Sequence, residues 1–240
     1  INLLEKNTEI GHHIDCHGDG IKDVSLTVDN AENAWKTSIE RGAKSAMEPT
    51  EIKDDNGEAI ISSIHTFGDT IHTFIERNNY KGCFLPGYSD FQPQPDSQLP
   101  KLIHIDHVVG NQPDGEMQTV CDFYEKVFGW HRFWTVDDND ITTEYSSLRS
   151  IVMANDNEIV KMPINEPAEG LKKSQIQEFI DYYETAGVQH LALSTKNIIQ
   201  SVEIMKKNGV EFLPTPESYY KNLTERVGEI DEDIETLKKL

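Results

Sequence analysis

The stretch Gly187–Thr195, GVQHLALST, is a short apolar strand pattern that carries one histidine, and the pattern occurs more than once in the chain. An earlier copy, Gly20–Val28 (GIKDVSLTV), aligns with it without a gap, and a helical run and then a glycine follow both copies. A third strand of the same kind, Leu102–Val109 (LIHIDHVV), lies between them. Such repetition predicts one structural unit that the chain uses several times.

The first unit continues from its opening strand into one helix and then into further strands. Asp29 or Asn30 suits the N-cap of the helix, and Gly42 suits its end. The turn Asp54–Gly57 separates extended segments. The predicted elements are a strand at Ile21–Val28, a helix at Ala31–Arg41, and strands at Ala59–Phe67 and Thr70–Glu76.

The second unit restarts the same order of elements at Leu102. Gly129 marks the end of its helix. The predicted elements are a helix at Met117–Phe128, strands at Trp130–Asp137, Glu144–Ala154 and Glu158–Ile164, and later helices at Ser174–Thr185, Ile198–Asn208 and Asp231–Lys239. The sequence therefore predicts an α+β fold of repeated βαβββ modules, in which two modules pair into one cup.

Prolines and glycines are concentrated between residues 80 and 100, a composition typical of a connection between domains. We expect residues 1–80 to be the remainder of a first domain, 81–100 a linker, and 101–240 a second, incomplete domain. After Val210–Leu213 the third module should supply further strands, yet the sequence turns helical. Together with a start at Ile1, this predicts a fragment that lacks both ends.

Composition limits the classes of partner. The net charge of −20 argues against nucleic acid and anionic membrane surfaces, because both require a positive surface. The three cysteines are widely spaced and predict reduced thiols in a cytoplasmic protein. No apolar run is long enough to predict a membrane span.

Two histidines occupy similar strands of repeated modules, His107 and His190. Pairing the modules would bring both imidazoles to a common interior, and a non-haem iron site uses two histidines and one carboxylate on one face. His104 competes with His107, but the two face opposite ways on a strand, and the match with His190 favours His107. The first unit has Asp23 at this position, which predicts a structural copy without the ligands.

Other polar clusters favour structural interpretations. We expect the histidine-rich residues 1–19 to form a mobile or strand-edge segment, because their spacing fits no metal site type. The remaining histidines His65, His72 and His131 are assigned to packing or surface, and Asp137–Asp140 to a solvated turn. The sequence contains no nucleophile elbow, phosphate loop or dinucleotide fingerprint.

Several runs resemble the 4-hydroxyphenylpyruvate dioxygenases over essentially the whole chain. The second half carries the runs Ile105–Gln112, Glu144–Ala154, Lys161–Pro167, Lys173–Phe179 and Gly187–His190, and the first half carries Gly18–Gly20 and Phe84–Tyr88. The resemblance implies the vicinal-oxygen-chelate (glyoxalase-like) superfold, in which βαβββ modules pair into open barrels. It also implies that residues 1–80 are non-catalytic and that 101–240 are catalytic.

The resemblance implies Fe(II) held by two histidines and one glutamate, with His107 and His190 as the histidines and the glutamate absent from this chain. The same match gives Ser150, Asn165 and Gln175 as substrate-binding residues, and Gln189 as a fourth. Strand alternation turns Gln189 away from the face of His190 unless the strand twists or bulges there.

The implied reaction is the O2-dependent oxidative decarboxylation and ring hydroxylation of 4-hydroxyphenylpyruvate to homogentisate, in tyrosine and phenylalanine catabolism. We expect a homo-oligomer, with a dimer favoured, and little or no activity from the fragment, because its third ligand is missing. Two alternatives remain: 4-hydroxymandelate synthase, which oxidises the same substrate at the benzylic carbon, and a metal-free binding module of the same fold.

Overall fold

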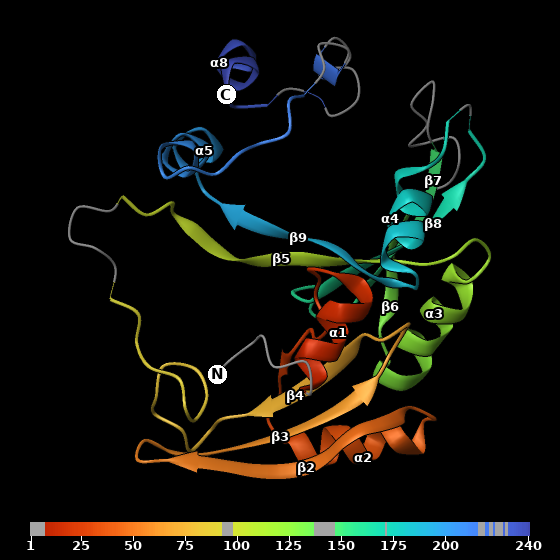
Figure 1. The fold of residues 1–240 in the computed structure, drawn as a ribbon, viewed down its shortest axis with the longest axis vertical. Helices are drawn as coiled ribbons and strands as arrows, with labels where there is room; N and C mark the ends of the chain where they lie inside the picture. The colour runs from red at the N-terminus through yellow and green to blue at the C-terminus, as the bar shows by residue number, and fades with distance from the viewer. Residues whose placement is uncertain are drawn as a thin grey trace. The chain divides into compact units, whose positions relative to one another are not determined.

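The computed structural model of the chain describes residues 8–92, 98–136, 147–170, 172–215, 219–220, 223, 228 and 230–240. The described chain divides into two compact units (Figure 1). The first combines Ile1–Asp90 with Asp106–Ala192, and the second combines Phe91–Ile105 with Leu193–Leu240. The predicted turn at Asp137–Asp140 and the start of the strand predicted at Glu144 lie outside the described residues.

The first module forms a four-stranded sheet in the order β1-β4-β3-β2. Its elements are β1 (Leu26–Thr27), α2 (Ala31–Glu40), β2 (Lys44–Asp54), β3 (Gly57–His65) and β4 (Ile71–Glu76). The prediction of a continuous strand over Ile21–Val28 is wrong: only β1 is a regular strand. The residues before it change partner, since Ile21 bridges to Val188 while Asp23 bridges to Ile71.

The second module repeats this arrangement within a five-stranded sheet of order β6-β7-β8-β5-β9. Its strands are β5 (Leu102–Asn111), β6 (His131–Val136), β7 (Ser147–Ala154), β8 (Lys161–Ala168) and β9 (Gly187–Thr195). In both modules the opening strand runs parallel to the last one, β1 with β4 and β5 with β8. The predicted repeat of one βαβββ unit is therefore confirmed, and β9 lies next to β5.

Helix ends follow the local sequence closely. Asn30 caps α2 by accepting a hydrogen bond from the backbone N–H of Asn33 at 2.6 Å. Asn197, its counterpart in the repeat, caps α5 in the same way. Further helices that the structure describes are α3 (Met117–Phe123), η1 (Tyr124–Phe128), α4 (Gln175–Tyr183), α5 (Ile198–Lys207) and α8 (Ile234–Lys239). The predicted helix Met117–Phe128 is thus helical over its whole length, as α3 followed directly by the π-helix η1.

The N-terminal histidines lie in a helix, so the prediction of a mobile or strand-edge segment is wrong for the described residues of this stretch; residues 1–7 lie outside them. Thr8 caps α1 (Glu9–His17), and His13 and His17 lie one turn apart on its buried face. The phenol of Tyr183 lies 2.9 Å from His13 Nε2, and the Tyr183 carbonyl lies 2.7 Å from His17 Nδ1. The physical reason is packing against a distant aromatic residue, which the local pattern does not contain.

The core of the first unit takes side chains from both modules. Tyr124 is fully buried and stacks on Phe128 and on Trp130, with ring centroids 5.4 and 5.1 Å away. The surrounding cluster joins Phe67 of the first module to Met153 and Ile164 of the second. The two modules therefore belong to one compact unit because their side chains share a core. The domain boundaries inferred above, at residues 80 and 101, remain predictions about function.

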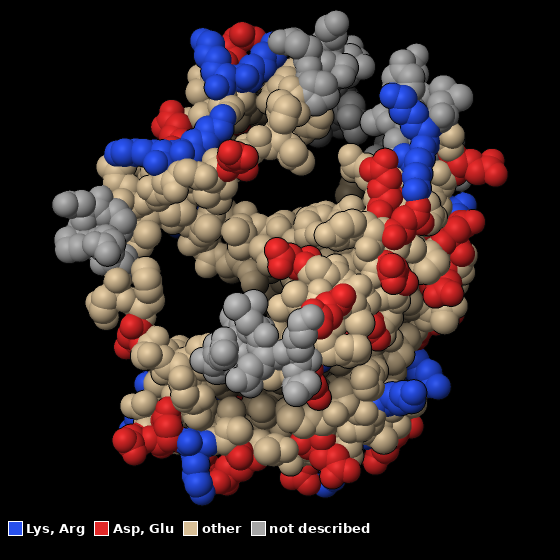
Figure 2. All heavy atoms as spheres, viewed as in Figure 1, with Lys and Arg blue, Asp and Glu red and all other residues tan. Residues whose placement is uncertain are grey.

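The surface agrees with the acidic composition. Figure 2 shows Asp and Glu side chains spread over the face in view, with Lys and Arg groups scattered between them. Among the helices that the structure describes, none combines the length and the apolar character that crossing a bilayer would require.

Candidate functional site

The position of β9 beside β5 brings the two candidate histidines together. The rings of His107 and His190 lie with their centroids 6.0 Å apart and their planes at 75°, an edge-to-face arrangement. His107 is half-buried and His190 is more exposed. His104, the competitor on β5, has an exposed side chain. The pair that the repeat favoured is therefore the pair that the fold brings into contact.

Each ring is held at Nδ1 by the residue that precedes it. Asp106 Oδ2 lies 2.8 Å from His107 Nδ1, and Gln189 Oε1 lies 3.0 Å from His190 Nδ1. Alternation along β9 predicted that Gln189 turns away from His190. That prediction is wrong for the end of the side chain, because a glutamine is long enough to reach back to the neighbouring ring.

The electrostatics favour the neutral form of His190 and the ionised form of Asp106. Desolvation lowers the pKa of His190, and the nearby His107 lowers it further. The hydrogen bond with His107 lowers the pKa of Asp106, and Lys161, whose Nζ lies 3.6 Å from Asp106 Oδ1, acts in the same direction. A neutral imidazole has a lone pair available for a metal ion.

The donor set fits a metal of the non-haem iron type only in part. Two imidazoles are the nitrogen ligands of the two-histidine, one-carboxylate site. Among the described residues, no group of three or more His, Cys, Asp or Glu side chains is arranged to hold an ion. The described part of the chain thus supplies two of the three ligands that such a site needs.

Two of the four predicted substrate residues face each other across neighbouring strands. Ser150 on β7 pairs directly with Asn165 on β8, and both side chains are buried. Asn165 pairs in turn with Asn111 on β5, four residues after His107, so alternation places all of them on one face of the sheet. The Asn165 amide donates a hydrogen bond to Asn111 Oδ1 at 3.4 Å.

Gln175 and Gln189 occupy less enclosed positions. Gln175 is the first residue of α4, directly after the N-cap Ser174, and its side chain is exposed. Gln189 is half-buried and contacts His190. The structure therefore joins Ser150 with Asn165 and Gln189 with His190, while it gives Gln175 no hydrogen bond to these four residues.

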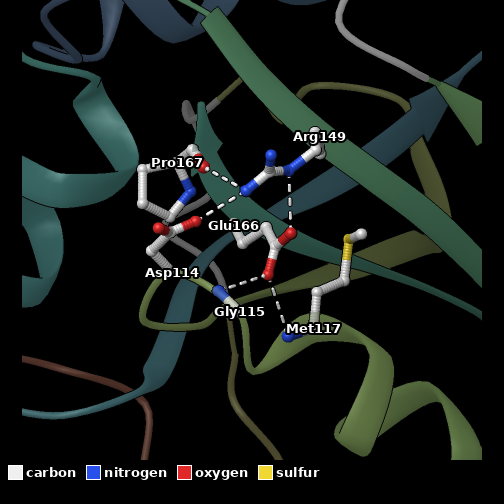
Figure 3. Close-up of polar contacts among 6 residues, drawn as sticks. All are labelled: Asp114, Gly115, Met117, Arg149, Glu166 and Pro167. Carbon is white, nitrogen blue, oxygen red and sulfur yellow. Dashed lines mark hydrogen bonds and ion pairs between the residues drawn. The ribbon is translucent and has the colours of Figure 1, made fainter. Parts of the chain in front are cut away.

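The opposite face of the same strands carries an ionic cluster around the buried Glu166 (Figure 3). Arg149 and Glu166, the neighbours of Ser150 and Asn165, form an ion pair of 2.8 Å between Nε and Oε1. The second Glu166 oxygen accepts hydrogen bonds from the backbone N–H groups of Gly115 and Met117, at 2.9 and 3.2 Å. This carboxylate therefore ties β7, β8 and the start of α3 together.

The remaining candidates have structural partners. Asp23 accepts hydrogen bonds from the Thr73 hydroxyl and backbone N–H, at 2.6 and 3.2 Å. His72 is fully buried, which confirms its assignment to packing. His65 and His131 are exposed on the surface.

Two features of the site were missing from the sequence-based interpretation. Asp106 was overlooked as a partner of His107, although it directly precedes that residue. The buried amides of Asn111 and Gln112 were also overlooked. Gln112 is completely buried, and neither polar atom of its side chain has a partner among the described residues. The run Asp106–Gln112 contained the only available signal, a cluster of polar residues in a strand with apolar neighbours.

Comparisons with known proteins agree with this architecture. The Glyoxalase/Bleomycin resistance protein/Dioxygenase superfamily matches residues 104–233. Proteins named 4-hydroxyphenylpyruvate dioxygenase are similar over nearly the whole chain. The Coccidioides posadasii protein is 48% identical over 97% of this chain and 60% of its own length. The Danio rerio protein is 49% identical over 98% and 61%, and the Dictyostelium discoideum protein is 46% identical over 99% and 67%.

Solved structures show the same fold. A triple mutant of 4-hydroxymandelate synthase from Streptomyces coelicolor aligns with a TM-score of 0.77 and 26% identity, over 98% of this chain and 66% of that chain. A xylose isomerase-like TIM barrel/4-hydroxyphenylpyruvate dioxygenase fusion protein aligns at 0.67 and 17% identity, over 97% and 34%. The chain spans about 60% of the length of the first relatives. It belongs to the glyoxalase/bleomycin resistance protein/dioxygenase superfamily and, within it, to the 4-hydroxyphenylpyruvate dioxygenase family.

Proposed function

We propose that this chain is part of a 4-hydroxyphenylpyruvate dioxygenase, which uses Fe(II) and O2 to convert 4-hydroxyphenylpyruvate to homogentisate in tyrosine and phenylalanine catabolism. The observation that carries the proposal is the edge-to-face pair His107 and His190, on the adjacent opening strands of two repeated modules. The identity of 46–49% to proteins of that name supports the same reaction.

His107 and His190 would hold the iron, together with a carboxylate that the described residues do not supply. When bound, Fe(II) supplies the oxygen chemistry, which removes the carboxylate of the 2-oxo acid and hydroxylates the ring. The protein contributes the orientation of the substrate and the exclusion of water. The net charge of −20 gives an anionic substrate no long-range attraction, so local cations and the metal must attract it.

Ser150 and Asn165 are suited to the phenol end of the substrate. Both are buried and directly opposed, and a hydroxyl and an amide can each donate and accept hydrogen bonds. One N–H of the Asn165 amide is used by Asn111, which leaves its second N–H and its carbonyl oxygen to donate to or accept from the phenol. Gln175 and Gln189 complete the proposed set of substrate residues.

We infer a cytoplasmic, homo-oligomeric enzyme, with a dimer as the favoured form. The free state of Cys16, Cys83 and Cys121 supports a reducing compartment. The catalytic role is assigned to residues 101–240, the non-catalytic role to 1–80, and the connection between them to 81–100.

The test is turnover by the protein in which this chain is completed by its remaining residues. That protein should form homogentisate only with Fe(II), and His190→Ala should abolish product formation and reduce bound iron below one equivalent. His65→Ala is the matched control, because His65 is an exposed strand histidine outside the site. Full turnover by His190→Ala would contradict the ligand assignment. The 240-residue chain alone should show little or no activity, because its described residues supply only two of the three ligands.

A second candidate function is 4-hydroxymandelate synthase, favoured by the alignment with that enzyme over 98% of this chain. It would use the same histidines and substrate but oxidise the benzylic carbon. Chromatography of the product separates the two reactions, since homogentisate carries both of its hydroxyls on the ring, whereas 4-hydroxymandelate carries one on the ring and one on the benzylic carbon. Stoichiometric iron would in turn exclude the metal-free binding module.

A further inference from the structure

The two candidate ligands share a local arrangement that their chemistry does not require. Each histidine is preceded by a residue whose side-chain oxygen contacts the ring at Nδ1, Asp106 before His107 and Gln189 before His190. Side chains of consecutive strand residues point to opposite faces. Both preceding side chains must therefore bend back to reach the ring, and they do so in both modules.

The acceptors decide which ring nitrogen carries the proton. A carboxylate oxygen and an amide carbonyl oxygen only accept hydrogen bonds, so Nδ1 of each ring must donate. A neutral imidazole has one N–H, and with the proton on Nδ1 the lone pair lies on Nε2. Nε2 of neither ring forms a hydrogen bond with another described residue.

We propose that Asp106 and Gln189 are positioning residues that hold His107 and His190 in the Nδ1–H tautomer, so that both rings present Nε2 to the metal. The inference rests on the proposed function for its metal, but the tautomer itself is a property of the metal-free chain. It assigns to Gln189 a role through His190, in addition to the substrate contact proposed for it.

The two partners differ in charge, and their surroundings match the difference. The Asp106 carboxylate has Lys161 as a second neighbour, with 3.6 Å between Nζ and Oδ1, and Lys161 pairs with His107 in the β5/β8 register. Gln189 is neutral. Both side chains nevertheless offer an oxygen that only accepts, so the same ring nitrogen is expected to carry the proton in both modules.

The tautomers can be measured directly on the metal-free 240-residue chain. In long-range ¹H–¹⁵N spectra of histidine-labelled protein at pH 8, the nitrogen coupled to both ring carbon protons is Nε2. That nitrogen should have the downfield shift of an unprotonated nitrogen in both rings, whereas free histidine in water prefers the proton on Nε2. His107→Gln and His190→Gln assign the signals. A protonated Nε2 on His107 or His190 would overturn the inference.

Substitution of the acceptors separates a positioning role from a merely structural one. Asp106→Leu should return His107 to the Nε2–H form and leave His190 unchanged, and Gln189→Leu should do the reverse. Asp106→Asn and Gln189→Glu keep an acceptor oxygen and should retain the Nδ1–H form. An Nδ1–H signal from His107 in Asp106→Leu would contradict the proposal. If the leucine variants fail to fold, the unaltered chain and the conservative variants still decide the tautomers.

Metal binding provides the second measurement. Co(II) added to the unaltered chain should broaden the His107 and His190 signals before those of other histidines. Asp106→Leu should raise the Co(II) concentration required by about 10- to 100-fold, the usual cost of losing an outer partner of a metal ligand. If both rings show the Nδ1–H form, and Co(II) leaves them sharp in this chain and does not bind to the longer protein that supplies a carboxylate, the tautomer inference holds while the proposed metal centre fails.

Discussion

At the scale of single residues, His72 shows how burial fixes a protonation state. It is completely buried on β4, and its Nδ1–H donates to the carbonyl of Val24 at 2.9 Å. Its Nε2 lies 2.8 Å from the Tyr124 hydroxyl, which can donate to it. The neutral ring can form both hydrogen bonds. Desolvation lowers the pKa of His72 to about 4.

This pKa predicts a loss of stability in mild acid. The ordinary histidine value is 6.5, so between pH 6.5 and about 4 the unfolded chain binds a proton that the folded chain does not. The neutral His72 ring therefore makes its full contribution to the free energy of unfolding above pH 6.5. This contribution falls with the pH, by roughly 3 kcal/mol at pH 4. Urea unfolding between pH 7 and pH 4 measures it.

The matched variants for this prediction are His72→Gln and His65→Gln. The first removes the buried titrating group and should flatten the decline in unfolding free energy. The second removes an exposed histidine on the neighbouring strand and should leave the decline nearly as it is in the unaltered chain. Equal pH dependence in the unaltered chain and His72→Gln would show that His72 is not the cause.

At the scale of elements, Glu166 connects a strand pair to a helix. Its side chain is 8% exposed, and it accepts hydrogen bonds from Arg149 on β7 and from two backbone N–H groups at the start of α3. Asp114 contacts the same arginine but is 71% exposed. A buried carboxylate with several donors contributes more than an exposed one, which is screened by water.

Glu166→Gln should therefore destabilise the chain by about 2 kcal/mol, because it removes the charge while the arginine and the helix N–H groups stay in place. Asp114→Asn, the control on the same arginine, should cost less than about 1 kcal/mol. Urea unfolding at pH 7 compares the two. Equal costs would mean that burial of Glu166 does not determine the strength of the cluster.

At the scale of the whole molecule, the first compact unit is built from two separate segments of the chain. Residues 1–90 and 106–192 belong to it, and its core joins Phe67 with Tyr124 and Val188. Apolar burial is the main stabilising term in folding, and here it depends on both segments. Neither segment alone contains all the side chains of this core.

This arrangement predicts that the first unit survives a break in the chain. A protease site inserted between Asp90 and Lys101, followed by cleavage, should leave one peak in size-exclusion chromatography that contains both fragments. Tyr124→Ala, which removes a fully buried ring at the centre of the core, should cause the cleaved fragments to separate. Separation of the fragments without that substitution would contradict a shared core.

Local patterns predicted the helices and most strands because caps and periodicity act over a few residues. Asn30 and Asn197 cap equivalent helices, as their alignment in the repeat indicated. The failures occur where a distant partner decides the structure. The strand predicted at Ile21–Val28 is interrupted because Ile21 bridges to Val188, and the residues before it form a helix that packs on Tyr183.

For the candidate site, the sequence predicted the repeated module, the two histidines and, through the family resemblance, the proposed pocket residues. Only the tertiary structure decided that β9 lies beside β5, which places the two rings 6.0 Å apart. It also decided that the side chains of Asp106 and Gln189 reach Nδ1 of the histidines that follow them. On the opposite face of the sheet, it decided that Glu166 pairs with Arg149. The reason is physical: side-chain period and helix caps are local, whereas strand order and side-chain partners depend on which distant segments share a core.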